Sequence, residues 1–117
     1  INIALNSLKF IDSRLLIRIK NFTKLNLTSN YIEKISIDSF LHFYSLEEID
    51  LKNNEIILIE DFSFKSLQML KKLNLEFNKL KVITKNTFIN MRNLKQLNLS
   101  YNLIEFIEFN SFHSLSC

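Results

Sequence analysis

Few residues in this chain combine types and spacings that could support catalysis. The two histidines, His42 and His113, stand at non-equivalent places, and no cysteine lies beside His42. The single cysteine, Cys117, has no second cysteine with which to form an internal disulfide or a cysteine zinc site. We therefore interpret both histidines as surface or spacer residues rather than metal ligands or catalytic bases.

Two acidic pairs are the remaining candidates for acid–base chemistry. Glu47-Glu48 and Glu60-Asp61 each place two carboxyl groups side by side in the sequence. In the repeat described below, both pairs should face lysines of neighbouring turns or solvent, so neither shares an apolar pocket that would raise the pKa of one member. The chain contains no glycine, which excludes a glycine-rich phosphate-binding loop. We therefore predict no enzyme, no cofactor and no metal site within these 117 residues.

The chain instead repeats one unit about five times with a period of 24 residues. Segments that begin at Phe22, Leu46, Leu70 and Leu94 align without insertion or deletion, and the N-terminal residues follow the same register. Units of this length bury their apolar faces by stacking on their neighbours. We expect one domain, residues 1–117, with repeats at about 1–21, 22–45, 46–69, 70–93 and 94–117.

Each unit contains a strand signal followed by an asparagine. Apolar residues two apart, such as Leu73 and Leu75, indicate a short strand. Three residues later, an asparagine amide can bond backbone groups that are buried where the chain bends. We expect strands near residues 1–4, 24–28, 48–52, 72–76 and 96–100. The predicted asparagine ladder consists of Asn6, Asn30, Asn54, Asn78 and Asn102.

A large apolar residue also recurs in the second half of each unit. We expect four of these residues to stack as an aromatic spine, namely Phe40, Phe64, Phe88 and Phe112. A serine or threonine precedes each one, at Ser39, Ser63, Thr87 and Ser111, and is expected to cap a helical turn. The first unit has Leu15 and Leu16 at these places, so its turn should be less regular.

These units resemble the 24-residue leucine-rich repeat, LxxLxLxxNxLxxLxxxxFxxLxx. The resemblance implies an α/β leucine-rich-repeat solenoid, a right-handed horseshoe with a parallel β-sheet on its concave face and irregular or 3₁₀ turns on its convex face. In this family the outward strand residues of the concave face usually contact the partner. Asparagine or aspartate between the two strand leucines is common in the family, so we expect this column to be mainly structural. Its members are Asn2, Asn26, Asp50, Asn74 and Asn98. The implied ligand-binding residues are Lys24, Thr28, Glu48, Asp50, Lys52, Lys72, Glu76, Phe77, Gln96, Ser100 and Tyr101.

The resemblance implies a non-enzymatic module that recognises a protein or peptide ligand through its rigid concave sheet. Similar repeats occur in Toll-like receptor ectodomains and matrix proteins, which implies a receptor or secreted protein outside the cell or at its surface, with innate immunity among its roles. Two alternatives remain open. The repeats could be spacers in a longer solenoid that contacts its ligand elsewhere, or they could belong to an intracellular adaptor.

Both ends of the chain fall inside the repeat pattern, so we expect a fragment of a longer solenoid. Otherwise, self-association would have to cover the uncapped ends. No apolar run approaches the ~18–20 residues of a membrane span. We therefore expect no membrane insertion within these residues.

Charges are grouped in bands along the chain. Two bands are basic: residues 1–32 hold five basic residues and one acidic residue, and residues 62–95 hold eight basic residues and one acidic residue. Two bands are acidic: residues 33–61 hold two basic residues and eight acidic residues, and residues 96–117 hold two acidic residues and no basic ones. The stretch Lys65–Lys95 could suggest a nucleic-acid interface. In stacked repeats, however, residues 24 apart are neighbours and opposite charges alternate, so we predict no nucleic-acid partner. The expected pairs are Lys24 and Lys72 with Glu48, Glu47–Lys71, Lys52–Glu76, Glu55–Lys79, Asp61–Lys85, Lys9–Glu33 and Arg14–Asp38.

Three Asn-X-Ser/Thr sequons make Asn21, Asn26 and Asn98 candidate glycosylation sites. Asn21 is expected at a corner of the solenoid, where it would be the most accessible of the three. A glycan on Asn26 or Asn98 would obstruct the concave sheet, so the use of both would argue against binding there. Sequons also arise by chance in a chain so rich in asparagine.

Overall fold

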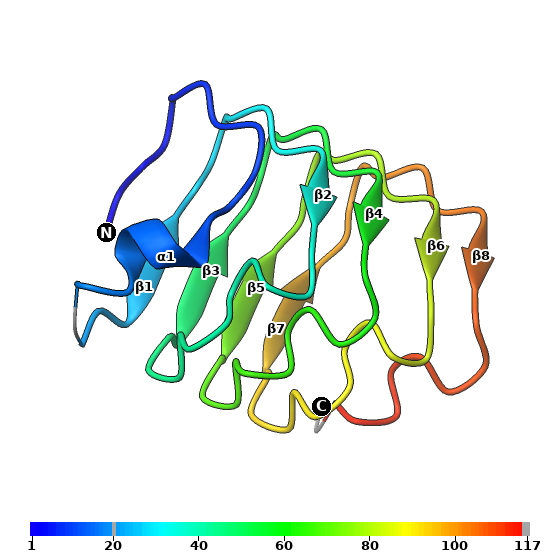
Figure 1. Cartoon of the computed structure of the whole chain (residues 1–117). Coiled ribbons are helices and arrows are strands. Elements are labelled where there is room, and N and C mark those ends of the chain that lie inside the picture. Colours follow the sequence, from blue (N-terminus) through cyan, green and yellow to red (C-terminus); the bar gives the residue numbers. More distant parts are fainter. Residues whose placement is uncertain (20, 116–117) are drawn as a thin grey trace.

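The chain coils into stacked turns, each of which adds one strand to a common sheet (Figure 1). The computed structural model describes residues 1–19 and 21–115. Four strands form this parallel sheet in chain order, and an isolated bridge between Asn2 and Asn26 joins the first turn to its edge. The strands are β1 (Lys24–Asn26), β3 (Glu48–Asp50), β5 (Lys72–Asn74) and β7 (Gln96–Asn98). The predicted parallel-sheet solenoid is confirmed.

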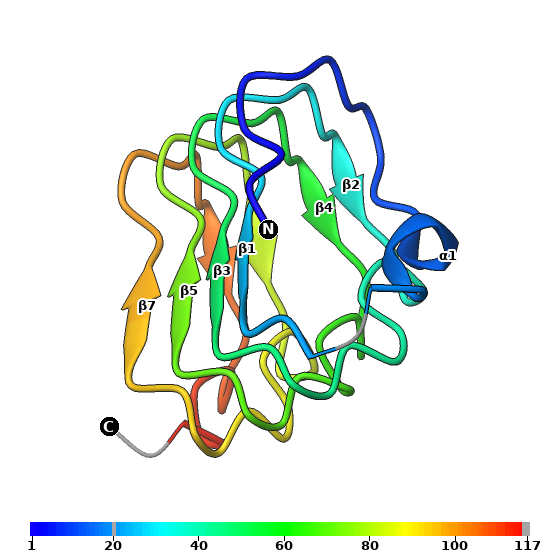
Figure 2. The same cartoon turned by 90° about the vertical axis from the view of Figure 1, so that its left-hand side faces the viewer.

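A second row of strands forms the opposite wall (Figure 2). These strands pair in parallel as two small sheets, β2 with β4 and β6 with β8. The family resemblance had implied irregular or 3₁₀ turns here, and strands of only two residues are too short to show an alternating pattern in the sequence. The four are β2 (Lys34–Ile35), β4 (Leu58–Ile59), β6 (Val82–Ile83) and β8 (Phe106–Ile107).

The strands of the main sheet begin where the spacing predicts but end two residues earlier. In β1 the Asn26 Oδ1 accepts the backbone N–H of Thr28 at 3.0 Å. A longer strand would donate this N–H to the preceding turn, as the Asn26 N–H does to the Ile1 carbonyl, so the side-chain bond ends the strand here. The neighbouring turns stay bonded beyond this point, since the Ser29 N–H donates to the Lys52 carbonyl at 2.9 Å.

The first repeat differs from the others, as its sequence suggests. In place of an irregular turn it contains a four-residue helix, α1 (Ser13–Leu16). The Asp12 side chain caps the helix by accepting the Arg14 N–H at 3.0 Å. Among the described residues, no helix has the length and apolarity needed to span a bilayer.

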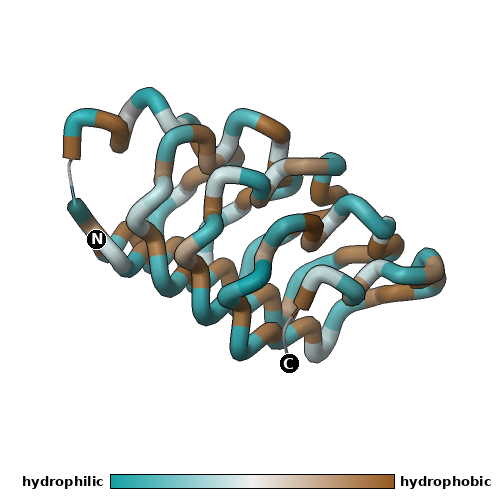
Figure 3. Tube along the Cα trace, turned by 90° about the horizontal axis from the view of Figure 1, so that it is seen from below, coloured by the Kyte–Doolittle hydropathy of each residue, from teal (hydrophilic) through white to brown (hydrophobic). Residues whose placement is uncertain are grey.

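Apolar side chains from both walls fill the space between them, and each coil repeats the same alternation of apolar and polar residues (Figure 3). Phe40, Phe64 and Phe88 are at most 1% exposed, with neighbouring ring centroids 5.9 and 6.1 Å apart. Phe112 continues the row 5.9 Å from Phe88 but is 38% exposed, because only one turn packs against it. The rings therefore form a continuous stack inside the convex wall.

The asparagine column bonds successive turns to one another. The Asn54 Nδ2 donates to the carbonyl of Leu51 in its own turn and to that of Leu27 in the preceding turn, both at 3.0 Å. Its Oδ1 accepts the Ile32 N–H at 3.1 Å. Asn30, Asn78 and Asn102 repeat this geometry, whereas Asn6 is exposed and bonds only carbonyls of its own turn. Backbone groups that neither wall can pair are satisfied in this way.

The serine and threonine residues before the spine phenylalanines do not cap helices, contrary to the prediction. Each of these residues is buried, and each hydrogen-bonds the residue three places earlier, where a tight turn begins. The Thr87 Oγ1 accepts the Thr84 N–H at 2.9 Å, and the Ser63 Oγ donates to the Glu60 carbonyl at 2.6 Å. The turns are too short to form a helix in which these residues would stand at the N-cap.

Candidate recognition surface

The outward residues of β1, β3, β5 and β7 line a shallow hollow of about 790 Å³. Every second strand residue points away from the core because side chains alternate across a sheet. We call these outward positions, together with the residues two places beyond each strand, the concave surface. It brings together the sequence-predicted residues Lys24, Thr28, Glu48, Asp50, Lys52, Lys72, Glu76, Gln96 and Ser100, all of which are half-buried or exposed.

Glu48 lies between two lysines of neighbouring strands. Its Oε1 is 3.4 Å from the Lys24 Nζ and 3.5 Å from the Lys72 Nζ. Burial alone would raise the pKa of the Glu48 carboxyl, but hydrogen bonding and charge attraction from Lys24, and then from Lys72, hold that pKa below its ordinary value. Gln96 extends the row on β7. The first column of the surface is thus a row of alternating charges.

The middle column has a clear structural role. Its members are Asn2, Asn26, Asp50, Asn74 and Asn98, and in each case the Oδ1 accepts the backbone N–H two residues later at 2.9 to 3.0 Å. For Asp50 that donor is Lys52. This bond ends each strand at the same level, which explains why only asparagine and aspartate occur in the column. Asp50 therefore has a structural role in ending its strand, although its side chain is half-exposed on the concave surface.

Beyond the strands, Lys52 connects the charged surface to an aromatic pair. Its Nζ is 3.0 Å from the Glu76 Oε2 and 5.5 Å from the centroid of the Phe77 ring. Phe77 stacks in turn on Tyr101, with centroids 4.3 Å apart and planes inclined by 7°. Phe77 is 42% exposed and Tyr101 70% exposed. A cation and two stacked rings are thus held together at the edge of the sheet.

The backbone at this edge is unusual. Leu5, Ser29, Asn53, Phe77 and Tyr101 occupy one column, and each has a φ between 54° and 57°. A non-glycine residue in this left-handed region costs about 1–2 kcal/mol. The sequence could not show this strain, although its 24-residue spacing does place Phe77 beside Tyr101. The left-handed corner aims both rings out of the solenoid in a fixed direction.

Not all of the predicted ion pairs across the turns form. Glu47 pairs with Lys71 at 2.8 Å, and Glu55 pairs with Lys79. The predicted Asp61–Lys85, Lys9–Glu33 and Arg14–Asp38 pairs are wrong. Asp61 instead accepts the Thr84 hydroxyl and the Asn86 amide, while Lys85 pairs with Glu108, and Arg14 pairs with Asp12. Lys9 and Glu33 meet only through their backbones, at 3.3 Å.

The remaining predicted residues are the three sequon asparagines, the histidines and the cysteine. Among the sequons, Asn21 is exposed at a corner of the first turn, whereas Asn26 and Asn98 are half-buried in the middle column of the concave surface. His42 bonds through its Nδ1 to the Tyr44 hydroxyl at 3.3 Å. Within residues 1–19 and 21–115, no group of three or more histidine, cysteine or acidic residues could hold a metal ion. Cys117 lies outside the described residues.

Comparison with known families decides what kind of solenoid this is. A family model described as leucine rich repeat matches residues 20–80 and residues 68–117. The chain belongs to the leucine-rich repeat family. Its ladder asparagines and spine phenylalanines are therefore positions of a leucine-rich repeat. A search of curated proteins finds no match.

Two solved leucine-rich repeat structures resemble the chain. The first is a crystal structure of the TLR13–ssRNA13 complex, with a TM-score of 0.77 and 33% identity over 91% of this chain and 15% of that chain. The second is the glycosylated form of the Toll–Spatzle complex of Drosophila, with a TM-score of 0.82 and 24% identity over 93% of this chain and 16% of that chain. The repeats are therefore similar to those of Toll-like ectodomains, and the chain spans about one sixth of the similar chains.

Proposed function

We propose that this leucine-rich repeat chain is a non-enzymatic module that recognises a protein or peptide ligand. Contact is made through the concave surface and the Phe77–Tyr101 pair at its edge. The observation that carries the proposal is this aromatic pair, which is exposed and yet fixed by stacking and by a left-handed backbone. A side chain that is already ordered loses little entropy when a ligand binds, and aromatic residues dominate interface energies.

The charges beside the aromatic pair favour a protein over a nucleic acid. Lys24, Lys52 and Lys72 are all paired with glutamates, so the concave surface presents no continuous positive stripe for a phosphate backbone. The TLR13 structure contains ssRNA13, however, and so the comparisons give no support to the expectation that nucleic acid is excluded. RNA is therefore the competing outcome in any test for a ligand.

We further propose that the chain belongs to a receptor or a secreted protein, outside the cell or on its surface. The support is its similarity to TLR13 at 33% identity and to the fold of Toll. An intracellular adaptor with the same repeats is the alternative. The two differ in whether the native protein enters the secretory pathway, which fractionation of the cells that produce it would reveal.

One observation favours a second function, that of a spacer within a longer solenoid. The row of Lys24, Glu48 and Lys72 and the pair of Lys52 with Glu76 satisfy one another's charges without any ligand. A surface whose only role is to hold neighbouring repeats together would have its charged side chains paired with one another in this way. The spacer function predicts that these side chains contribute to the stability of the repeats and not to ligand binding.

A comparison of two triple variants separates recognition from spacing. The first variant changes the concave surface (Glu48→Gln, Lys72→Gln, Tyr101→Ala), and the charge-matched control changes exposed residues of the opposite wall (Lys81→Gln, Glu105→Gln, Phe106→Ala). Proteins that associate with each form of the full gene product in its own cells are quantified by mass spectrometry. Recognition predicts that one partner is lost by the first variant and retained by the control. The same partners with all three forms, at equal thermal stability, would favour the spacer.

A further inference from the structure

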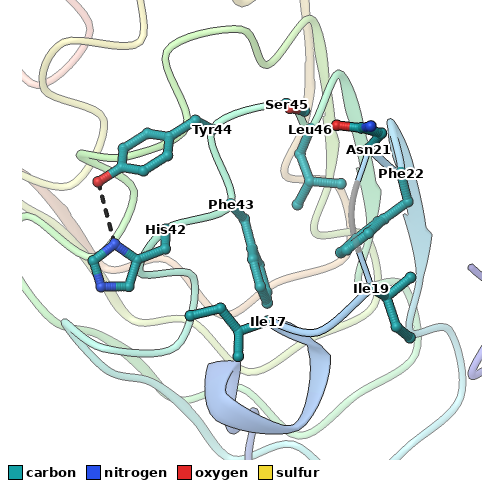
Figure 4. Close-up of a pocket in the computed structure, with 9 residues that line it drawn as sticks. All are labelled: Ile17, Ile19, Asn21, Phe22, His42, Phe43, Tyr44, Ser45 and Leu46. Carbon is teal, nitrogen blue, oxygen red and sulfur yellow. Dashed lines mark hydrogen bonds between the residues drawn. The ribbon is translucent and has the colours of Figure 1, made fainter.

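A crevice of about 210 Å³ opens between the end of the first turn and the second turn of the solenoid (Figure 4). Phe43 lies in the middle of the group that lines it, and the Phe22 ring meets the Phe43 ring edge-on with centroids 5.5 Å apart. Phe43 and Leu46 are at most 5% exposed. The crevice therefore has an apolar floor that is continuous with the core.

The walls of this crevice leave apolar surface open to water. Ile17 is 49% exposed and Ile19 47% exposed on one side, and Tyr44 is 56% exposed on the other. Exposed apolar groups gathered around a hollow provide a surface that a small partly apolar group can cover. Tyr44 directs its hydroxyl to His42 at the rim, so the rim is polar while the floor is apolar. An occupant with one apolar face and several hydroxyls would match this arrangement.

Asn21 supplies the anchor for such an occupant. It lines the crevice on the side of Phe22, opposite Tyr44, and it begins the sequon Asn21-Phe22-Thr23. Its side chain is exposed, and its φ of 65° is positive. Asparagine tolerates this left-handed conformation better than most residues. The residues that align with Asn21 in later turns, Ser45, Met69 and Asn93, do not have a positive φ, so the corner at Asn21 is particular to this place.

The other two sequons differ from Asn21 in position and in bonding. The Asn26 and Asn98 side chains lie in the middle column of the concave surface, where their Oδ1 atoms accept the backbone N–H groups of Thr28 and Ser100 at 3.0 and 2.9 Å. Both are half-buried and lie in the shallow hollow of the concave surface. A glycan there would cover the surface proposed to bind the ligand.

We propose that Asn21 carries an N-linked glycan and that its first N-acetylglucosamine occupies this crevice. The Asn21 Nδ2 forms a bond to C1 of the sugar, the bond from C1 to the diphosphate of a lipid-linked donor breaks, and the proton lost by the amide ends on the released diphosphate. The acetamido methyl group then covers the Phe22 and Phe43 rings, and the hydroxyls face water and the Tyr44 rim. The inference rests on the extracellular part of the proposed function.

Glycopeptide mapping tests the site itself. The full gene product is directed into the secretory pathway of cultured eukaryotic cells with an added signal peptide, and the occupancy of all three sequons is measured by mass spectrometry. We expect a glycan at Asn21, its loss in Asn21→Gln, and an unchanged glycan mass in the matched variant Asn98→Gln. A bare Asn21 in the wild type, or a glycan carried mainly by Asn26 or Asn98, would overturn the assignment.

A second measurement tests whether the first N-acetylglucosamine lies in the crevice. An endoglycosidase trims the glycan to one N-acetylglucosamine, while an amidase removes it completely and leaves aspartate, for which the variant Asn21→Asp is the control. Hydrogen exchange of the backbone at residues 42–46 should be several-fold slower with the single sugar than in either bare form. The variant Tyr44→Ala should reduce this difference. Equal exchange rates in all three forms would overturn the proposal that the sugar occupies the crevice.

The location of the native protein is tested separately, on material from its own cells. A glycan at Asn21 there would support both proposals together. If Asn21 is glycosylated in the secreted product but bare in the native one, the extracellular location fails and the site stands. If Asn21 is bare in the secreted product, the site fails whatever the location of the native protein.

Discussion

Replacing Asn78 by alanine would remove a side chain that bonds three buried backbone groups, besides a weaker bond to the half-buried Glu76 carbonyl at 3.3 Å. Asn78 is 5% exposed, its Nδ2 donates to the carbonyls of Leu51 and Leu75 at 3.0 and 3.1 Å, and its Oδ1 accepts the Ile56 N–H at 3.1 Å. A buried polar group left unpaired costs about 1–3 kcal/mol. Three such groups, partly relieved by water that enters the gap, give an expected loss of about 3–5 kcal/mol in unfolding free energy.

The chain offers a matched control for this substitution. The Asn6 Nδ2 also donates to two carbonyls, those of Ile3 and Ala4, each at 3.0 Å, but Asn6 is exposed. Water can replace these bonds, so Asn6→Ala should lose less than about 1 kcal/mol. Urea unfolding followed by circular dichroism gives both losses from the midpoint and the slope. Equal losses in the two variants would refute the reasoning that the asparagine column is needed to satisfy buried backbone groups.

Three further predictions concern the spine, the corner and the charges. Phe88→Ala should lower the unfolding free energy by about 3–5 kcal/mol and the half-exposed Phe112→Ala by less; equal melting temperatures would contradict a buried stack. Ser29→Gly should raise the unfolding free energy slightly, because glycine relieves the positive φ; a loss of stability would count against strain. Hydrogen bonds from the Lys34 side chain and, to a lesser degree, from the Ile37 N–H lower the pKa of Glu60 in the folded chain. The unfolding free energy should therefore fall as the pH drops below about 4.5, and it should fall less steeply in the variant Glu60→Gln.

Much of the fold was predictable because one period governs the whole chain. The 24-residue spacing fixes which residues are neighbours, so the sheet register, the spine and the pairing of Glu48 with two lysines followed from the sequence. The same spacing placed Phe77 beside Tyr101, although the tilt of the rings and the left-handed backbone depend on atomic packing. Predictions that needed only adjacency therefore succeeded more often than those that needed side-chain geometry.

The errors arose where several partners competed for one group. Asp61 was assigned to Lys85 by spacing, but the hydroxyl of Thr84 and the amide of Asn86 satisfy it, and Lys85 turns to Glu108 instead. The strands were predicted two residues too long because apolar spacing does not show that the side chains of Asn26 and Asn98 accept the backbone N–H groups two residues later. The crevice at Asn21 lies just after the helix that replaces the regular turn in the first repeat. The departure of Leu15 and Leu16 from the repeat predicted a less regular turn there, but it could not show the shape that the turn takes.

The central claim is that ligand contact occurs at the concave surface and its aromatic edge. A photoreactive phenylalanine analogue at position 101 probes that edge, and the same analogue at position 106, an exposed aromatic residue on the opposite wall, serves as the control. The full gene product is irradiated in its own cells, and the cross-linked species are identified after protease and nuclease treatment. We predict a protease-sensitive partner cross-linked from position 101 and none from position 106. Cross-links from position 106 alone, or a nuclease-sensitive partner at position 101, would contradict the claim.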